Sequence, residues 1–535
     1  MVRIKTEMDL ALLLLLLGAV IGLLVAYDRS LSVPLFCSFV ISLVVYGVLA
    51  RVSLSVARSL AWAMLGLWML GAWYLISQYA HMGYPAKIGL IHRLGELGSR
   101  LTPTLVLFSP PHRNVWATFL EGGPPLALSL VLSARGRWQR IAAAVALVST
   151  GYALLLTASR GAWMGLLCAG ALAAICWGRR VLARRALARR TWLWVMVGLA
   201  TLPLIVVSAV FVLGPANVPG IQGALDSASS RGVLYANAAH LLQDYALTGI
   251  GFGDTFALAY SRYILLIRAP YLTYAHDLLL AVWLNHGVVG VLGFIVGCVA
   301  LYRLLRRGLH QGAPALFWGA ALAVLVSSLH GITDATQYEG QGLTMPVFYA
   351  QLGLLVASAP ERPVARRGPG RMGAAVALGI LVLLALAWPA WWGIYLVNRG
   401  AVLQARADLD PQLPEAERIP LRAQAAAHYR QALGFWPAQT MAHRRLGLLA
   451  LDAGDNETAR SHLQRAWEAD PTHPANAHGL GYANLWSGRL DAAEVLLLGR
   501  HNVCQELSTW AWWRRQRGEE VLSQYAIDLE MRLCR

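Results

Sequence analysis

Charged side chains are scarce in this chain. Only 14% of its 535 residues are Asp, Glu, Lys or Arg, whereas 57% are hydrophobic. Apolar runs of about 20 residues, the length that crosses a bilayer as a helix, recur through the first three quarters of the sequence. This composition excludes a soluble enzyme and predicts an all-α, polytopic α-helical membrane protein.

A cleavage signal and metal-binding motifs are also missing. The first apolar run, from Leu10 to Ala26, follows Arg3 and Lys5, but no small-residue cleavage site comes after it. It is therefore expected to remain as a helix. No CxxC pair or His-x-x-x-His cluster indicates a structural metal site. We expect neither a metal nor another cofactor.

Acidic residues are nearly absent from the apolar runs, and Glu121 is the only one well inside a run. It begins the segment Glu121–Pro125, which would break a helix and must then be buried in protein or line a cavity. Glu121 is either a functional group or part of a capped kink, bonded to backbone amides that the break frees. A proton- or ion-coupled transporter would usually need more such groups.

Hydropathy delimits eleven candidate membrane spans. They cover about residues 10–27, 33–50, 59–78, 114–133, 141–157, 161–177, 191–213, 277–300, 313–330, 343–359 and 373–396. With the N-terminus in the cytoplasm, 20 basic residues lie inside and nine outside, so the positive-inside rule favours this orientation. It predicts a multi-pass protein of the cytoplasmic (inner) membrane, with the loop of residues 214–276 and the C-terminal region extracytoplasmic.

The net charge of +17 belongs to the membrane part, because residues 398–535 balance 16 Arg against 16 Asp and Glu. Basic clusters at the inner ends of spans are expected as topology signals and as contacts for anionic membrane lipids. The charge is therefore no evidence for a nucleic-acid partner.

An amphipathic helix is predicted between the third and fourth spans. Its apolar face would consist of Ile88, Ile91, Leu94, Leu97 and Leu101. Such a helix is expected to lie flat on the outer membrane surface, either to guide a lipid substrate or merely to cover the bundle.

The C-terminal region has a repeat of 34 residues. Ala425, Ala459 and Ala493 are one period apart, and so are Gly447 and Gly481. This period resembles tetratricopeptide repeats, in which helix pairs stack into a solenoid whose concave face binds peptides or partner proteins. We therefore divide the chain into a transmembrane domain, residues 1–397, and an extracytoplasmic repeat domain, residues 398–535, with a possible protein partner.

Cysteine positions agree with this division. Cys37, Cys168, Cys176 and Cys298 fall in apolar runs, where a thiol behaves as a small apolar group. Cys504 and Cys534 fall in the repeat domain, where oxidation is possible, and they are predicted to form a disulfide.

Three residues at the outer surface are candidates for catalysis. Arg160 opens a span in Thr157–Gly161, and Arg231 and His276 lie in the long polar segment. The guanidinium fork matches phosphate oxygens, so two arginines could clamp the diphosphate of a polyprenyl carrier. A histidine can take a proton from an attacking hydroxyl or orient a substrate. Individually, Arg160 also fits a lipid-headgroup anchor, and His276 fits a hydrogen-bonded interface histidine.

Neighbouring residues extend this candidate site. Arg262, Arg268, Tyr274 and Asp277 are expected to line the same substrate pocket, because they lie close in sequence to the proposed centre. The glycines of Thr248–Gly253 would form either a backbone nest for an anion or a turn. No dinucleotide fingerprint is indicated, because no strand precedes them and no long helix follows.

The order and spacing of these motifs resemble the O-antigen ligase and polymerase superfamily over roughly residues 100–355. The segments that carry the resemblance are Thr157–Gly161, Ser230-Arg231, Leu247–Gly251, Ala275–Leu278 and Gly287–Gly290. The resemblance implies a metal-independent, inverting membrane glycosyltransferase of the C-type architecture. It would move a glycan from undecaprenyl diphosphate onto a lipid A core sugar, a growing polysaccharide or a protein serine. The required roles would fall on Arg160, Arg231 and His276.

The choice among these acceptors stays open. Ala246, Asp277 and Asn285 depart from the residues usual in the superfamily, which weakens any assignment to a ligase, a polymerase or a protein O-oligosaccharyltransferase. Two other classes compete. A transporter would show internally repeated spans and paired intramembrane charges, and a non-catalytic scaffold would tolerate loss of the three candidate residues.

Overall fold

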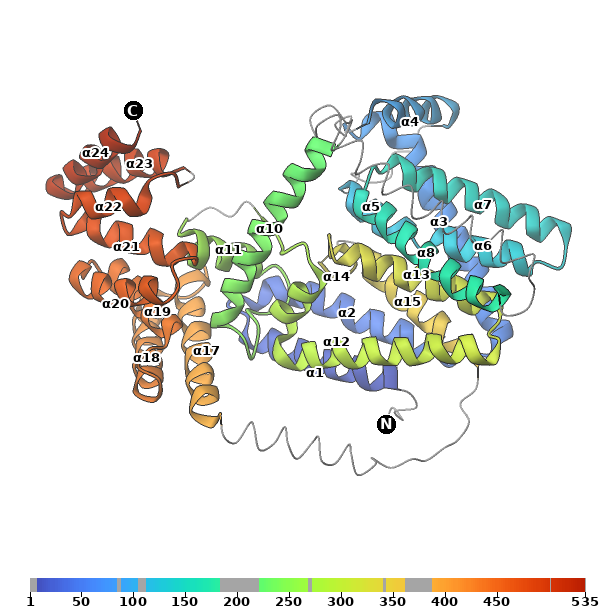
Figure 1. The fold of residues 1–535 in the computed structure, drawn as a ribbon, viewed down its shortest axis with the longest axis horizontal. Coiled ribbons are helices and arrows are strands. Elements are labelled where there is room, and N and C mark those ends of the chain that lie inside the picture. The colour runs from blue at the N-terminus through green and yellow to red at the C-terminus, as the bar shows by residue number, and fades with distance from the viewer. Residues whose placement is uncertain are drawn as a thin grey trace.

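The computed structural model describes residues 7–83, 88–103, 112–182, 221–267, 272–339, 343–360, 387–500 and 502–534. Every regular element in these ranges is a helix, which confirms the all-α prediction. Figure 1 shows two parts, a bundle of long helices built from the first two thirds of the chain and a stack of shorter helices at the C-terminus. The helix α10 (Ile221–Asp244) lies between them.

Long apolar helices form the bundle. Six segments within the described ranges are long and apolar enough to cross a membrane. Four of them are single helices: α1 (Glu7–Val25), α2 (Arg29–Leu49), α7 (Arg137–Leu156) and α12 (Leu278–Gln311). The other two each combine two elements, namely α3 (Leu54–Gln78) with the turn η1 (Tyr79–His81), and α5 (Arg113–Leu120) with α6 (Gly123–Ser133). Three further apolar helices are α8 (Arg160–Leu182), α13 (Ala315–Gly331) and α15 (Thr344–Ala357).

These helices coincide with most of the expected spans. The span expected at 191–213 lies outside the described residues, and of the span at 373–396 only the end is described, as the start of α17 (Trp388–Leu409). The total of eleven spans therefore stays a prediction. The break expected in the fourth span is present, because α5 ends at Leu120 and α6 begins at Gly123.

Small residues allow the closest helix packing in the bundle. The backbone of α1 passes so near α12 that a Cβ at Gly293 would lie 2.9 Å from the carbonyl oxygen of Ala11. A Cβ at Gly18 would lie 2.7 Å from the carbonyl oxygen of His286. Such contacts stabilise helix pairs in lipid, where apolar side chains gain little from leaving the tails. The pair α1 and α12 forms one side of the bundle and leads to the candidate site at the start of α12 (Figure 1).

The segment expected as an outer loop, residues 214–276, is largely helical where it is described. It contains α10, α11 (Phe256–Tyr260) and η3 (Ser261–Leu265). Helix α10 buries Leu234, Ala238, Leu241 and Leu242, whose spacing of four, three and one places them on one helical face. The polar residues between them conceal this pattern in the sequence.

The predicted amphipathic helix is present as α4 (Gly89–Leu101). It packs on its neighbours through Gly95 and Gly98, which meet the rings of Tyr79 and Tyr152. Ile91 is buried, whereas Leu101 is 77% exposed, so the expected apolar face is divided between the bundle and the surroundings. Its location on the membrane surface stays a prediction.

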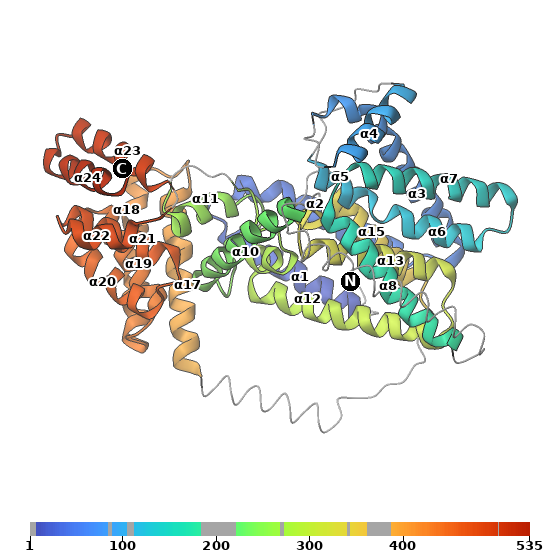
Figure 2. The same ribbon diagram turned by 45° about the horizontal axis from the view of Figure 1, so that its top comes forward.

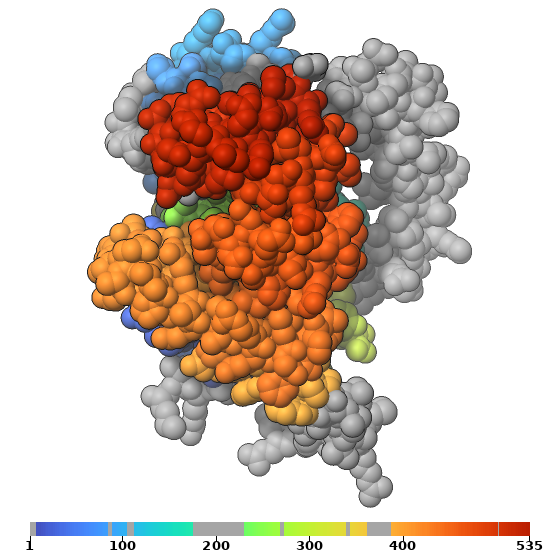
Figure 3. All heavy atoms as spheres, turned by 90° about the vertical axis from the view of Figure 1, so that its left-hand side faces the viewer, coloured from blue at the N-terminus to red at the C-terminus, as the bar shows by residue number. Residues whose placement is uncertain are grey.

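The C-terminal helices form stacked antiparallel pairs, as the 34-residue period predicts. They are α17, α18 (Glu415–Phe435), α19 (Thr440–Asp452), α20 (Asn456–Ala469), α21 (Pro474–Trp486), α22 (Leu490–Leu497), α23 (Val503–Gln516) and α24 (Glu520–Leu533). Figure 3 shows this stack from its outer side.

Equivalent positions of two repeats make equivalent contacts. A Cβ at Gly447 would lie 2.5 Å from Leu463, and one at Gly481 would lie 2.7 Å from Leu497. Gly is required at both positions because the second helix of each pair approaches the first so closely. At the end of the stack, Cys504 and Cys534 form a disulfide, as predicted.

Candidate active site

Asp334, in the turn after α13, is the point at which the candidate residues meet. Its side chain is 1% exposed. Oδ1 accepts a hydrogen bond from the Tyr274 hydroxyl at 2.7 Å and lies 3.2 Å from Nδ1 of His276. Oδ2 lies 4.0 Å from a terminal nitrogen of Arg231 and accepts a hydrogen bond from the side-chain amide of Asn114. Tyr274, His276 and Arg231, all singled out in the sequence, are thus brought together by a carboxylate.

The environment of Asp334 favours its charged form. Burial acts to raise the pKa of this carboxyl group, but the hydrogen bond and electrostatic interaction with His276 and the hydrogen bond from Tyr274 outweigh burial. The net pKa of Asp334 lies below its usual range. An ionised carboxylate next to Nδ1 orients the imidazole ring. Nε2 of His276 makes no hydrogen bond with any described residue, which leaves it to act on a ligand.

The backbone of His276 is held in an unusual conformation. Its φ of 55° lies in the left-handed region, which costs free energy for a residue other than glycine. The Tyr235 hydroxyl donates to the carbonyl oxygen of His276 at 3.0 Å, and the Tyr274 ring packs 4.0 Å from the imidazole centroid. Burial raises the pKa of Tyr235 to about 12, so this hydroxyl remains a donor at neutral pH. These contacts fix the direction of the imidazole.

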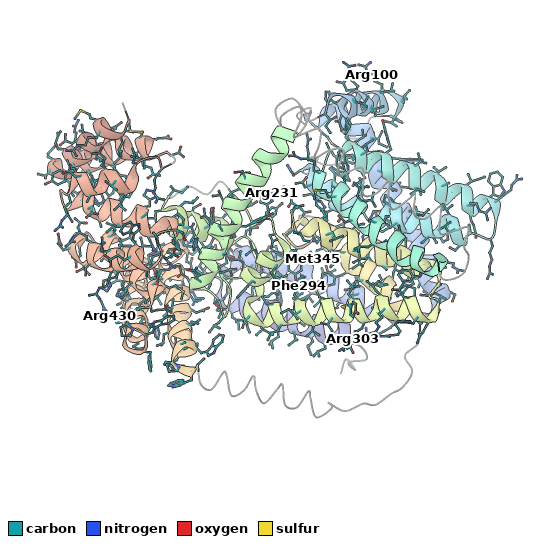
Figure 4. The ribbon with its side chains drawn as sticks, in the orientation of Figure 1. Arg100, Arg231, Phe294, Arg303, Met345 and Arg430 are labelled. Carbon is teal, nitrogen blue, oxygen red and sulfur yellow. A yellow bond between two sulfur atoms is a disulfide. The ribbon has the colours of Figure 1, made fainter. Side chains whose placement is uncertain are left out.

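Arg231 and Tyr235 both reach the site from α10, one helical turn apart. Figure 4 labels Arg231 on this helix, between the bundle and the C-terminal stack. The Arg231 side chain is 30% exposed. Its contact with Asp334 is long enough to leave donors of the guanidinium group available for an anionic ligand.

Arg160 starts α8 next to the turn that carries Asp334. A Cβ at the following Gly161 would clash with Thr333 and His330, so the start of α8 touches this turn directly. The turn before it includes Ala158 with a φ of 49°. Within the described ranges, the guanidinium group of Arg160 has no hydrogen bond or ion pair. Its charge is therefore available for an anionic ligand.

A second buried pair lies next to this turn. Nδ1 of His330 lies 2.7 Å from Oε2 of Glu121, and the two side chains are 1% and 0% exposed. The other side of the ring, Nε2, lies 3.3 Å from the Ser159 hydroxyl. Glu121 therefore bonds a histidine side chain rather than the backbone amides considered from the sequence. The pair connects the break in the fourth span to the residue that precedes Arg160.

Two of the secondary candidates bond partners other than Asp334. Asp277 is the N-cap of α12, where Oδ1 accepts a hydrogen bond from the Leu280 amide at 2.8 Å. Arg262 forms an ion pair with Asp452 of the repeat domain. Arg268 lies outside the described residues. Tyr274 is thus the secondary candidate that contacts the centre.

The glycine cluster forms a tight turn. Gly249, Gly251 and Gly253 have φ values of 71°, 121° and 96°. A Cβ at Gly251 would lie 2.7 Å from Cα of Ala26, and the Gly253 amide donates to Oδ1 of Asn285 at 3.2 Å. The sequence therefore uses glycine here for left-handed backbone and close packing, which confirms the turn.

Sequence reasoning missed Asp334, Asn114, Tyr235 and His330. None of them belongs to a motif, and the pair of Asp334 with His276 joins positions 58 residues apart. The one available signal was an acidic residue, Asp334, beside an apolar run. In the described part of the chain, no group of three or more His, Cys, Asp or Glu side chains could hold a metal ion.

Comparisons with known proteins find two matching family models. Residues 142–295 match the family model described as O-antigen ligase, and residues 450–499 match the model described as tetratricopeptide repeat. No curated protein matches the chain. The first match includes Arg160, Arg231 and His276 but ends before Asp334, and it supports a membrane ligase or polymerase that acts on glycans. Residues 142–295 are therefore similar to O-antigen ligases, and residues 450–499, in the C-terminal stack, are similar to tetratricopeptide repeats.

Proposed function

We propose that the protein is a membrane glycosyltransferase that transfers a glycan from undecaprenyl diphosphate to an acceptor hydroxyl at the outer face of the cytoplasmic membrane. The observation that carries the proposal is the meeting of Arg231, Tyr274 and His276 at Asp334, with Arg160 beside the same turn. A base, its orienting carboxylate and two cations are the groups that this reaction requires.

The donor would be held by the two arginines. Arg160 has no protein partner within the described ranges, and Arg231 is only loosely paired at 4.0 Å from Asp334. Their guanidinium groups would bind the diphosphate oxygens and neutralise the charge that develops there as the sugar–phosphate bond breaks. In this way the protein's own side chains would supply the positive charge that the leaving group needs.

The acceptor would be activated by His276. Nε2 accepts the proton of the acceptor hydroxyl while the hydroxyl oxygen attacks the anomeric carbon of the donor sugar. The bond from that carbon to the phosphate oxygen breaks, and undecaprenyl diphosphate leaves with the electron pair. A single displacement of this kind inverts the anomeric configuration. Asp334 stabilises the imidazolium that forms, and the Tyr235 contact keeps the ring in place.

The arrangement of charges supports an outer-face reaction. The basic residues favour a cytoplasmic N-terminus, which places Arg160 and the segment of α10 outside. The repeat domain packs against α10, so the site and the repeat domain lie on the same side of the membrane. A polymerase or a protein O-oligosaccharyltransferase would use the same residues, because these reactions differ in the acceptor and not in the donor.

A transfer assay with purified protein tests the proposal. The protein in detergent receives an undecaprenyl-diphosphate oligosaccharide, a panel of glycan, lipid and peptide acceptors, and a chelator. We expect release of undecaprenyl diphosphate that is lost in Arg160→Ala, Arg231→Ala and His276→Ala but retained in Arg100→Ala, an exposed arginine on α4. The mass of the product identifies the acceptor. Activity that survives all three site variants contradicts the proposal.

A further inference from the structure

The repeat domain is in contact with another segment of its own chain. Asp244, the last residue of α10, lies between two arginines of α19. Its carboxylate oxygens lie 2.6 Å from Arg444 and 2.7 Å from Arg445. The three side chains are 1%, 0% and 0% exposed. The Arg445 guanidinium also packs 3.8 Å from the ring centroid of Tyr263 in η3.

Further contacts surround this buried pair. Arg262 of η3 forms an ion pair with Asp452 at the end of α19. The side chain of Leu266, the next residue after η3, packs with the apolar core formed by α19, α20 and α21. On α17, the Asn398 side chain accepts hydrogen bonds from the backbone amides of Leu247 at 2.9 Å and Thr248 at 3.2 Å. Figure 2 shows α17 and the stack beside α10 and α11.

Burial of these charges indicates a permanent interface. Two guanidinium groups and one carboxylate are removed from water at the centre of the contact. If α10 separated from the repeat domain while Arg444 and Arg445 stayed buried, two buried charges would be left without a partner. This is strongly unfavourable. A surface kept free for a transient partner would not have its arginines buried in this way. The end of α10 at Asp244 and the segment Arg262–Leu266 therefore occupy this face of the repeat domain.

Helix α10 connects this interface to the candidate site. Arg231 precedes Asp244 by 13 residues on one continuous helix, a distance of about 20 Å along its axis. In the middle of α10, Arg231 and Tyr235 contact Asp334 and the backbone of His276. At its end, Asp244 is fixed in the repeat domain. A shift of the repeat domain would thus move the donors at the site.

We propose that the repeat domain binds the end of α10 and the segment Arg262–Leu266 of its own chain and, through Arg444 and Arg445, positions α10 and with it Arg231. The proposal rests on the proposed function for the role of Arg231 in donor binding. In this account Arg444 and Arg445 are positioning residues, and the repeat domain is a structural part of the transferase. A protein partner, if one binds, uses other surfaces of the repeat stack.

The test combines hydrogen exchange with kinetics on the full-length chain. Asp244→Asn removes the charge but keeps the shape of the side chain. We expect faster amide exchange in residues 232–244 and 440–452, and a turnover number about 100-fold lower, since small displacements of a binding group have effects of that size. The matched control is Asp491→Asn, which breaks an exposed ion pair with Arg532 between α22 and α24. The control is expected to change neither quantity.

A charge exchange provides a second route if Asp244→Asn does not fold. Arg262→Asp and Asp452→Arg alone should each loosen the interface, and the double variant should restore both slow exchange and turnover. Faster exchange with unchanged turnover overturns the positioning role. Unchanged exchange in Asp244→Asn overturns the claim that this ion pair holds the interface.

Binding of undecaprenyl diphosphate, followed in parallel, separates this proposal from the proposed function. If the wild type binds this product but transfers no glycan, its affinity for undecaprenyl diphosphate can still be compared with that of Asp244→Asn. Weaker binding by the variant then supports the positioning of Arg231. If the wild type neither transfers nor binds, the donor assignment fails, and hydrogen exchange still decides whether the repeat domain is docked through Asp244.

Discussion

The carboxylate of Asp334 lies 3.2 Å from Nδ1 of His276, although 58 residues separate them in the chain. The contact joins the segment before α12 to the turn after α13. Because Nδ1 of His276 faces Asp334, the other ring nitrogen, Nε2, points away from this carboxylate. In the proposed mechanism, this contact gives the base His276 an orienting carboxylate, and it was not visible in any sequence motif.

Replacing Asp334 by Asn should impair catalysis more than folding. The amide cannot stabilise the imidazolium and favours the wrong ring tautomer, so we expect a turnover number about 100- to 10,000-fold lower. Transfer rates at saturating donor measure the effect. The matched control is Asp455→Asn, which alters the N-cap of α20, remote in sequence from the site, and should keep wild-type turnover. Equal turnover in both variants would remove Asp334 from the mechanism.

The stability provided by Asp334 should depend on pH. Its pKa in the folded protein lies below the usual value, so its contacts stabilise the fold fully above the unfolded pKa, at about pH 4. This stabilisation is lost as the pH falls through the folded pKa. The unfolding temperature of the wild type should therefore exceed that of Asp334→Asn at pH 7, and the difference should shrink only below about pH 4. A difference that grows on acidification has the opposite sign and contradicts the assignment.

Arg160 and Arg231 should contribute to donor affinity through geometry as well as charge. Loss of one guanidinium–phosphate interaction is expected to weaken undecaprenyl-diphosphate binding by about 10- to 100-fold, the effect of a hydrogen bond to a charged group. Arg→Lys at either position keeps the charge but loses the planar fork, and it should recover only part of the affinity. Direct binding measurements on the Ala and Lys variants check this. Arg100→Ala serves as the control, and an equal loss there would indicate a non-specific charge effect.

The buried Glu121–His330 pair should respond differently to two substitutions. Glu121→Ala leaves His330 without its carboxylate and opens a cavity, with an expected cost of about 3–5 kcal/mol. Glu121→Gln keeps the shape and can still bond the ring, so it should cost less. Unfolding of both variants in detergent measures the difference. Equally small losses would show that the pair does not stabilise the break between α5 and α6.

The disulfide should stabilise the end of the repeat stack. Cys504 and Cys534 are 30 residues apart, and closing a loop of this length is worth about 3–4 kcal/mol in the chain-entropy model. Cys504→Ser should therefore lower the unfolding temperature and increase hydrogen exchange in α23 and α24. Exchange that stays at the wild-type rate would mean that apolar packing alone holds these helices.

Local patterns accounted for most of the fold. Apolar runs set the membrane helices, and the positions of Gly447 and Gly481 revealed the repeat, because both signals depend on residues near each other in sequence. Helix α10 was concealed, since polar side chains interrupt Leu234, Ala238 and Leu241. The helix becomes evident when these residues are seen on one buried face.

The candidate site was predicted less completely for a physical reason. Arg160, Arg231 and His276 belong to motifs, but Asp334 reaches them only through the packing of α13 beside α8. Proximity in sequence also gave no sign that Arg262, which is 14 residues from His276, pairs with Asp452. The left-handed residue Leu266 lies between them and redirects the chain after η3.

The most direct measurement is the release of undecaprenyl diphosphate by His276→Ala, Asp334→Asn and the double variant, each compared with the wild type under chelating conditions. If the two residues act as one base, each single variant loses transfer and the double variant is no slower than His276→Ala alone. Near-normal turnover in Asp334→Asn, or losses that simply multiply in the double variant, would contradict the account.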